Sequence, residues 1–425
     1  MSVSADKPRK QNLWTRAAIW CVAGAVILGV GFASGATAMW FAMGRMGWNV
    51  NVPLVGDAAT LEPANADEMP RDEAIGLLEQ IWDILDAEYV EPESLDNTEM
   101  YRSAAAGLVA AVGDPHTAYV EPATASVLEE DLEGTFEGIG ATVKMEEGRV
   151  IIGRPLPNSP AEAAGIQPGD VILEVDGTSL EGMGLYEVVA LIRGPKGTVV
   201  RLLVEREGVD EPFIVPVTRD KVEAPIVASE MLEGTIVYLQ LTEFNAQAPR
   251  LVRNELRDLL KEDPKGIILD LRNNPGGYLH VGVQVASEFL PYDTTVLYEE
   301  RRDVDEPVRY AAERGGLATD LPMVVLVNGG SASAAEIVAG AIRDNDRGAL
   351  IGTITYGKGS VQSTHTLSDG SGLRVTISRW QLPSGQQLMG EGIAPDIEVE
   401  MTTEDWTEGR DPQRDRAVQY LLEGR

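Results

Sequence analysis

The sequence predicts a multidomain α/β protein: an N-terminal transmembrane helix, a helical segment, a small β-barrel domain and an α/β core, in that order. Three observations carry this prediction. A charge-free apolar run lies near the N-terminus, short β-branched runs separated by Gly- and Pro-rich turns fill residues 127–219, and strand and helix patterns alternate over residues 220–400. Such alternation is typical of a parallel sheet with helices on its faces.

The composition is that of an acidic globular protein. The 67 acidic and 35 basic residues give a net charge of −32, which would repel phosphate backbones, so we expect no nucleic-acid partner. Cys21 is the single cysteine, which excludes an intramolecular disulfide and a Cys-rich zinc site. Three histidines offer little for a metal site or for His-dependent catalysis, so we expect neither a metal nor a cofactor.

Residues 1–48 predict a cytoplasmic tail followed by an uncleaved transmembrane signal anchor. Residues 17–43 carry no charge and would extend about 40 Å as a helix, against a hydrocarbon core of about 30 Å. Basic residues precede this run, so the positive-inside rule places the rest of the chain in the periplasm or at the cell exterior. A cleaved signal peptide is the alternative, because residues 36–38 read A-T-A, but the apolar run continues past that site.

Residues 49–70 are rich in Pro, Ala and Asp without periodicity, which predicts a linker. Residues 71–126 predict a helical segment, with apolar residues at helical spacing in 72–89 and a second helix over 97–112.

Residues 127–219 predict the small β-barrel domain with two helices, and Asp176-Gly177 is a turn signal between two of its strands. The expected strands are 150–152, 171–175, 199–205 and 213–217, and the expected helices are 159–164 and 185–192.

Residues 220–400 predict the α/β core, and residues 401–425 predict a C-terminal helical segment. The expected strands are 235–241, 266–271, 323–327 and 349–353, and the expected helices are 248–261, 278–290, 333–343 and 412–422.

Ser333 is the first candidate for chemistry. The buried strand 323–327 runs through Asn328-Gly329-Gly330 into a helix that starts near Ser333, where free N–H groups and a positive helix end suit a developing oxyanion. Taken alone, Ser333-x-x-Glu336 would equally be a helix capping box.

Lys358 is the second candidate. It lies between two glycines, and no other charged residue occurs between Arg347 and Asp369. A lysine acts as a base only when it is neutral, and burial without a nearby acid lowers its pKa accordingly. Gln362, four residues on, would orient the amine, and a solvated turn lysine is the alternative interpretation.

A third glycine turn, Pro275-Gly276-Gly277, follows the expected strand 266–271 and would present backbone N–H groups. A merely flexible strand–helix turn is the alternative. A serine nucleophile with a neutral lysine base needs no histidine, so the three turns fit one chemistry.

The chain resembles the carboxyl-terminal processing peptidases, also called tail-specific proteases, over roughly residues 72–422. Five segments carry the resemblance in the expected order: 114–117 (DPHT), 269–277 (LDLRNNPGG), 328–336 (NGGSASAAE), 356–362 (YGKGSVQ) and 392–396 (GIAPD).

The resemblance implies a crotonase/Clp-protease-like α/β catalytic core and a Ser–Lys dyad. It assigns the nucleophile to Ser333, the base to Lys358 and support of the lysine to Gln362, and Asp344 matches an aspartate that contributes in some members.

The resemblance also implies an oxyanion hole made of the backbone N–H groups of Gly276 or Gly277 and of Ala334. Ala335 departs from the family pattern, since a serine is usual there.

Residues 127–219 resemble the PDZ domain of such proteases. An extended peptide would add as a strand beside Ala141–Lys144. The expected carboxylate-binding loop is Gly138, Ile139, Gly140 and Ala141.

Together these features imply a membrane-anchored, extracytoplasmic serine endopeptidase that recognises the C-terminal tails of protein substrates. The resemblance is compatible with a homo-oligomer, which no segment demonstrates. A non-catalytic PDZ scaffold on a protease-like fold is the alternative, and the presence of both Ser333 and Lys358 favours the enzyme. A PDZ-bearing trypsin-like protease would need a catalytic histidine, and none is evident.

Overall fold

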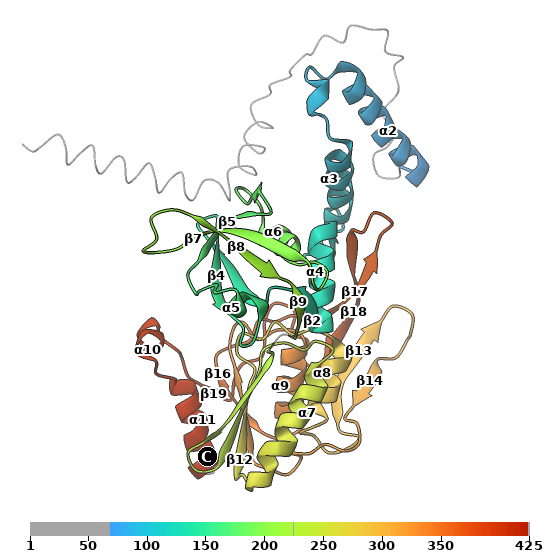
Figure 1. Ribbon diagram of the computed structural model, residues 1–425. Helices are drawn as coiled ribbons and strands as arrows, with labels where there is room; N and C mark the ends of the chain where they lie inside the picture. The colour runs from blue at the N-terminus through green and yellow to red at the C-terminus, as the bar shows by residue number, and fades with distance from the viewer. Residues whose placement is uncertain (1–68, 224, 424–425) are drawn as a thin grey trace, which may run out of the picture. The chain divides into compact units, whose positions relative to one another are not determined.

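The computed structural model describes residues 69–223 and 225–423, in two units that divide after Leu95 (Figure 1). The described part of the first unit holds helix α2 (Arg71–Glu88) and the short 3₁₀ helix η1 (Pro92–Ser94). Helix α2 has the predicted bounds to within a residue, yet none of its side chains is buried.

The predicted cytoplasmic tail and transmembrane anchor, and nearly all of the predicted linker, lie outside the described residues. Between residues 69 and 423, leaving out residue 224, no helix is both long enough and apolar enough to cross a bilayer. The anchor therefore stays a prediction.

Helix α4 (Pro122–Glu133) was not predicted, and the expected domain boundary between residues 126 and 127 falls inside it. Proline in the first helical turn and Gly134 at the end, with a φ of 74°, are the ordinary start and stop signals of a helix. Before it come helix α3 (Asn97–Ala110) and strand β1 (Ala118–Val120).

Residues 135–223, which lie within the second unit, form a subdomain that we call the small β module. Strands β2 (Thr135–Gly138) and β9 (Asp220–Glu223) pair antiparallel, so the chain enters and leaves the module side by side. Between them lies a six-stranded sheet of order β3-β4-β5-β7-β8, with β6 paired to β5. The bounds are β3 (Ala141–Glu146), β4 (Arg149–Pro155), β5 (Val171–Val175), β6 (Thr178–Ser179), β7 (Val199–Glu205) and β8 (Phe213–Thr218).

The sheet of this module is open, whereas the sequence predicted a barrel. Strands β3 and β8 lie at its two ends, and the described residues show no pairing between them. Helices α5 (Pro160–Ala163) and α6 (Leu185–Ile192) pack on the core instead, through Ala161, Val188 and Ile192. Because helices cover the apolar face, the sheet does not need to close on itself.

The α/β core is built on a six-stranded sheet of order β10-β11-β12-β15-β16-β19. Strands β10 and β11 pair antiparallel, and every later pair is parallel. The bounds are β10 (Val227–Leu232), β11 (Ile236–Leu241), β12 (Gly266–Asp270), β15 (Met323–Val327), β16 (Ala349–Gly352) and β19 (Ile397–Glu398).

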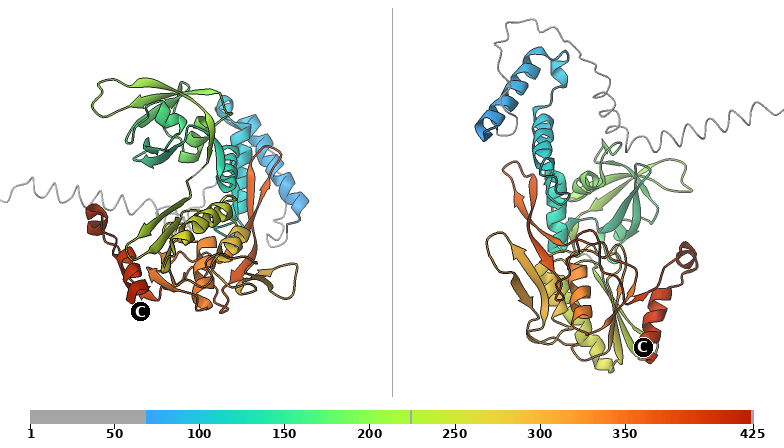
Figure 2. Two further views of the ribbon diagram at one scale, coloured as in Figure 1. Left: turned by 60° about the horizontal axis from the view of Figure 1, so that its bottom comes forward. Right: turned by 180° about the vertical axis from the view of Figure 1, so that it is seen from behind.

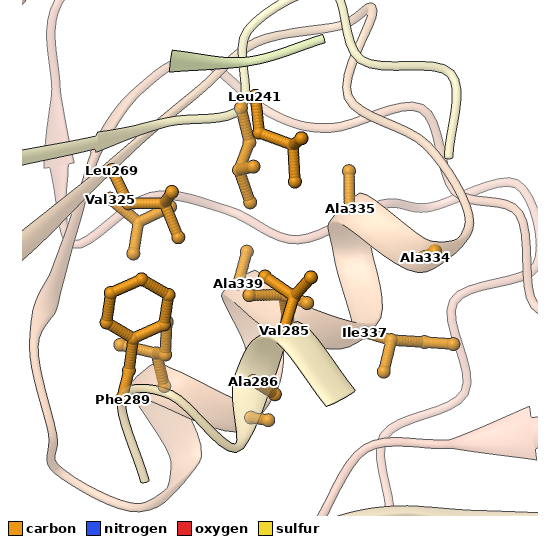
Figure 3. Close-up of a cluster of buried hydrophobic side chains, with 14 of the residues drawn as sticks. Leu241, Leu269, Val285, Ala286, Phe289, Val325, Ala334, Ala335, Ile337 and Ala339 are labelled. Atoms are coloured by element: carbon orange, nitrogen blue, oxygen red, sulfur yellow. The ribbon is translucent and has the colours of Figure 1, made fainter. Parts of the chain in front are cut away.

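Helices cover both faces of this sheet, as successive side chains of β12 illustrate. Ile267 and Leu269 point into the cluster shared with α7, α8 and α9, which Figure 3 shows in part, whereas Ile268 packs with residues of α11. Figure 2 shows α11 across the strands from α7, α8 and α9. The helices are α7 (Ala248–Leu259), η2 (Leu260–Glu262), α8 (Leu279–Ala286), α9 (Ala334–Asp344), α10 (Thr403–Glu408) and α11 (Pro412–Glu423).

A second, five-stranded sheet of order β1-β18-β13-β14, with β17 paired to β18, was not predicted. Most side chains of β17 and β18 are polar or only partly buried, so these strands lack the apolar pattern that marks the core strands. Strands β13 and β18 are almost 80 residues apart in sequence, so their pairing is a tertiary event. The bounds are β13 (Thr295–Arg301), β14 (Val308–Ala311), β17 (Ser360–Thr366) and β18 (Gly372–Gln381).

Candidate active site

The three predicted turns meet at one edge of the six-stranded sheet. Strands β12, β15 and β16 are parallel neighbours, and they end at Asp270, Val327 and Gly352. The carboxyl ends of parallel strands share one sheet edge, which is where α/β proteins place their sites. The turn after each strand therefore starts from the same place in the fold.

Hydrogen bonds between asparagines join the first two turns. The Asn273 backbone N–H donates to Asn328 Oδ1 at 2.8 Å. In return, Asn328 Nδ2 donates to Asn273 Oδ1 at 3.0 Å. The backbone N–H of Ala332 donates to the Asn274 carbonyl at 2.9 Å. These contacts fix the residues just before Ser333 against the glycine turn.

Gly276 lies directly against the start of α9. A Cβ built on this glycine would be 2.7 Å from Ser333 Cβ and 2.9 Å from the Ala334 nitrogen, and its φ is 97°. Only glycine fits such an approach with that backbone. The turn and the candidate nucleophile are therefore in contact.

The two glycines predicted for the oxyanion hole differ in whether their backbone N–H group is already hydrogen-bonded. The Gly276 N–H donates to Asn274 Oδ1 at 2.9 Å, so it is already paired. Within the part of the chain that the structure describes, the N–H groups of Gly277 and Ala334 donate no hydrogen bond. Of the predicted donors, Gly277 and Ala334 are thus the ones left for a ligand.

Ser333 is the N-cap of α9 and is only partly buried, whereas its neighbours on both sides are buried. Its φ of 54° with ψ of −116° is an unfavourable backbone conformation for a residue with a side chain, of the kind found at functional sites. Its N–H donates to Glu336 Oε2 at 2.9 Å, which is half of the predicted capping box.

Glu336 does more than cap the helix. Its Oε2 also accepts from the Lys358 N–H at 2.9 Å, and its Oε1 accepts from Thr355 Oγ1 at 2.6 Å and from the Gly357 N–H at 2.7 Å. The amide nitrogens of Ser333 and Lys358 both lie 2.9 Å from one oxygen atom, so they are at most twice that distance apart. The structure therefore brings the backbones of the predicted nucleophile and the predicted base together.

The Lys358 amine makes no hydrogen bond or ion pair with any described residue, and the side chain is partly buried. Burial lowers the pKa of Lys358 below its usual value, and the nearby Arg374 lowers it further, whereas Glu336 opposes both. The expected burial of the lysine is present, but the expected absence of a nearby acid is wrong, because Glu336 lies beside it. Neither Glu336 nor Arg374 could be placed near Lys358 from the sequence.

Gln362 and Asp344 make contacts other than the expected ones. The Gln362 amide donates to Ser360 Oγ at 2.9 Å and to Thr376 Oγ1 at 3.2 Å, and it does not hydrogen-bond to Lys358. Asp344 is eleven residues along α9 from Ser333, about 16 Å along the helix axis. It accepts from the adjacent Arg343 and from the Ser384 N–H.

The segment 392–396, whose role the sequence left open, supports the Lys358 turn. The Ile393 N–H donates to Thr355 Oγ1 at 2.7 Å, and a Cβ on Gly357 would be 2.7 Å from the Gly392 nitrogen. Sequence reasoning missed Thr355 and this support. Ser331 has a structural role in the turn, because it accepts from the Asn328 N–H and donates to the Leu271 carbonyl.

The predicted peptide-binding loop of the small β module, residues 138–141, leads into strand β3 at the open end of the sheet. Gly140 has a φ of 70°, and a Cβ on it would be 2.7 Å from Ser159 Cβ. The loop carbonyls of Ile139 and Gly140 accept backbone hydrogen bonds, whereas their N–H groups donate none among the residues described. One side of β3 is therefore unpaired beside a loop with free N–H groups.

Comparison with known proteins agrees with this architecture. Residues 235–399 match the model of peptidase family S41, and residues 151–206 match a PDZ domain. The chain is 37% identical to a carboxy-terminal-processing protease of Bartonella bacilliformis, over 74% of this chain and 73% of that protein. It is also 37% identical to a carboxyl-terminal-processing protease of Synechocystis sp., over 76% of each chain.

Among solved structures, an S41 protease of Bacteroides fragilis shares the fold, with a TM-score of 0.50 at 19% identity over 81% of this chain and 97% of that one. The chain therefore belongs to the carboxy-terminal processing proteases of peptidase family S41, and it is a serine-type peptidase that carries a PDZ domain.

Proposed function

We propose that this S41 peptidase is a membrane-anchored, extracytoplasmic endopeptidase that processes protein C-termini through a Ser–Lys dyad. The observation that carries the proposal is the shared contact at Glu336, which holds the backbones of Ser333 and Lys358 beside each other. The names of the relatives in Bartonella and Synechocystis support processing at the carboxyl terminus.

In the proposed acylation step, the neutral amine of Lys358 accepts the hydroxyl proton of Ser333, and the serine oxygen attacks the carbonyl carbon of the scissile bond. The carbonyl oxygen becomes an oxyanion, which the free N–H groups of Gly277 and Ala334 would stabilise. The lysine ammonium then gives its proton to the leaving amine as the C–N bond breaks, which leaves an ester on Ser333.

In the proposed deacylation step, the same lysine accepts a proton from a water molecule that attacks the ester. The proton returns to the serine oxygen as the C–O bond breaks, which releases the acid and regenerates the enzyme. The lowered pKa of Lys358 supports this role, because a lysine must be neutral to accept a proton. Gln362 and Asp344 have no contact that supports a direct part in these steps.

Substrate capture is assigned to the small β module. The open side of β3 and the unpaired N–H groups of Ile139 and Gly140 favour addition of an extended peptide that ends in a carboxylate. The tail of an unfolded protein has this chemistry.

Anchoring is assigned to residues 17–43, on the basis of their length and lack of charge. A chain without residues 1–48 should leave the membrane fraction, and the peptidase region of the full chain should be digested by protease added outside the inner membrane. Retention of the shortened chain in the membrane fraction would contradict the anchor.

The catalytic test uses the full chain in a nonionic detergent and an unfolded reporter protein with an apolar C-terminal tail. Ser333→Ala and Lys358→Ala should abolish cleavage, and EDTA should have no effect. Ser363→Ala is the matched control, because this serine lies on β17 nearby and should be dispensable. Cleavage by Ser333→Ala at the wild-type rate would exclude the nucleophile, and a wild type that binds the tail without cleaving it would favour a scaffold.

A further inference from the structure

We infer that Glu336 is a positioning residue, which fixes the backbones of the nucleophile Ser333 and the base Lys358 relative to each other through hydrogen bonds to one carboxylate. The inference rests on the proposed Ser–Lys mechanism. It concerns a residue for which the sequence suggested only a helix cap.

Glu336 accepts more hydrogen bonds than a helix cap requires. In a capping box the Glu side chain accepts one hydrogen bond, from the N-cap N–H, and the Ser333 N–H provides it. The other three donors, from Thr355, Gly357 and Lys358, belong to the loop that carries the base. Three of the four contacts thus have no role in capping the helix.

Glu336 is also buried, without a cation among the described residues to neutralise it. The Glu336 side chain is fully buried, and it forms no ion pair with any residue in the described ranges. Burying a carboxylate without a cation is costly unless hydrogen bonds and dipoles compensate for the lost water. Here four donors and the positive end of α9 provide that compensation.

The hydrogen bonds to Glu336 are supported by the segment 392–396, which contacts Thr355. Thr355 Oγ1 donates to Glu336 Oε1 and at the same time accepts from the Ile393 N–H at 2.7 Å. A Cβ on Gly392 would lie 2.2 Å from the Thr355 carbonyl oxygen, so the segment 392–396 is packed tightly against the loop. The carboxylate therefore links α9, the lysine loop and this segment.

The charge of Glu336 acts on the base as well. Two charged groups influence the Lys358 amine: Arg374 on β18 lowers its pKa, and Glu336 on α9 raises it. Replacing the carboxylate by a neutral amide of the same shape removes the opposing influence. The base would then lose its proton at a lower pH.

Glu336→Gln and Glu336→Asp separate the effect of the negative charge from the effect of the side-chain length. Glutamine keeps the cap but turns an N–H₂ group toward donors, so kcat should fall roughly 100-fold, as expected for a misplaced catalytic pair. The acidic limb of the kcat/KM profile should also move to lower pH, because that limb reports the base of the free enzyme. Aspartate keeps the negative charge, but its side chain is one methylene shorter and cannot reach all four donors. Its kcat should therefore fall, whereas the acidic limb of its kcat/KM profile should move less than in the glutamine variant.

Thr355→Val is the matched control. It removes one of the four donors and leaves the charge, so it should slow cleavage without moving the limb. All variants are assayed in the full chain with the unfolded reporter, and thermal unfolding checks that they fold. If Glu336→Gln does not fold, the aspartate variant decides, and an aspartate variant with wild-type kcat would overturn the inference.

Two other results would also overturn it: wild-type kinetics in Glu336→Gln, or a lower kcat with an unmoved limb, which a simple helix cap predicts. Ser333→Ala is assayed in parallel. If it still cleaves, the Ser–Lys mechanism itself is wrong, whereas an inactive Ser333→Ala beside an unaffected Glu336→Gln would exclude this inference alone.

Discussion

The α/β core and the small β module each present backbone N–H groups from a glycine turn, but they hold that turn differently. In the core, the turn at Gly276 is fixed by the Asn274 side chain and by a parallel bridge between Phe244 and Gly277. In the module, the loop at Gly140 is held by backbone contacts and by packing on Ser159, and it opens onto the unpaired side of β3.

The difference follows from what each turn would bind. Donors that stabilise a transition state must already be in place, since any reorganisation during the reaction raises the barrier. An edge that accepts a peptide strand needs only unpaired backbone groups and room beside them. A rigid turn suits the core, and an open edge suits the module.

The largest expected effect concerns two partly buried arginines, one in each region, that pair with buried aspartates. In the core, Arg272 bridges the fully buried Asp270 at 2.6 Å and Asp411 at 2.8 Å. Arg272→Ala leaves these carboxylates without their cation and should destabilise the core by about 3–5 kcal/mol. In the module, Arg206→Ala leaves Asp170 with a backbone hydrogen bond from Gln167 but without its cation. The loss should be about 1–3 kcal/mol, because Arg206 is more exposed than Arg272.

Hydrogen exchange read by mass spectrometry on the full chain localises the two losses. Each variant should speed exchange in its own region more than in the other. Equal loss of protection in the core from both variants would mean that the two regions are not separately stabilised.

The next effect concerns the core turn. Gly276→Ala places a Cβ 2.7 Å from the Ala332 carbonyl oxygen and from Ser333 Cβ, so cleavage of the reporter should fall roughly 100-fold. Gly385→Ala is the control, because Gly385 has a similar φ of 85° and nothing lies within 4 Å of its Cβ position. The control should lose about 1 kcal/mol of stability and keep its activity. A Gly276→Ala enzyme of normal activity would show that the turn is not rigid.

A smaller effect is expected for the module loop. Gly140→Ala would crowd Ser159, and the substitution should weaken binding of a tailed reporter about tenfold, which corresponds to about 1.4 kcal/mol. Cleavage of a short peptide without the tail should not change. An equal loss on both substrates would mean that the loop affects catalysis rather than capture.

The smallest effect concerns the folding stability that the chain loses by burying the Lys358 amine. The pKa of Lys358 is lowered in the folded chain, chiefly by burial, so the folded state binds fewer protons there than the unfolded state. Wild-type stability should therefore rise with pH between the lowered pKa and the usual value of 10.5. Lys358→Met removes this cost, so the inactive variant should be more stable than wild type at pH 7, by a margin that shrinks toward pH 10. Urea unfolding at both values measures it, and a constant margin would contradict the assignment.

Much of the core and of the small β module could be predicted from local patterns. Strand β15 and helix α6 have the predicted bounds, because each is an uninterrupted apolar or periodic segment with clear turns on both sides. The five-stranded sheet could not be predicted, because β17 and β18 carry mostly polar or half-exposed residues and owe their pairing to distant segments. The short strand β1 pairs with β18 more than 250 residues later in the chain.

The sequence by itself determined which residue types stand at the turns: a serine at a helix start, a lysine between glycines and a pair of glycines after a buried strand. Each of these depends only on near neighbours. The tertiary structure decided which groups meet. It paired the Gly276 N–H and left that of Gly277 free, brought Arg374 near the base, placed Asp344 at the far end of α9, and directed four donors to Glu336. Hydrogen bonds and charges act over a few ångströms in space, and the distance between two residues in space is set by the fold rather than by their separation along the chain.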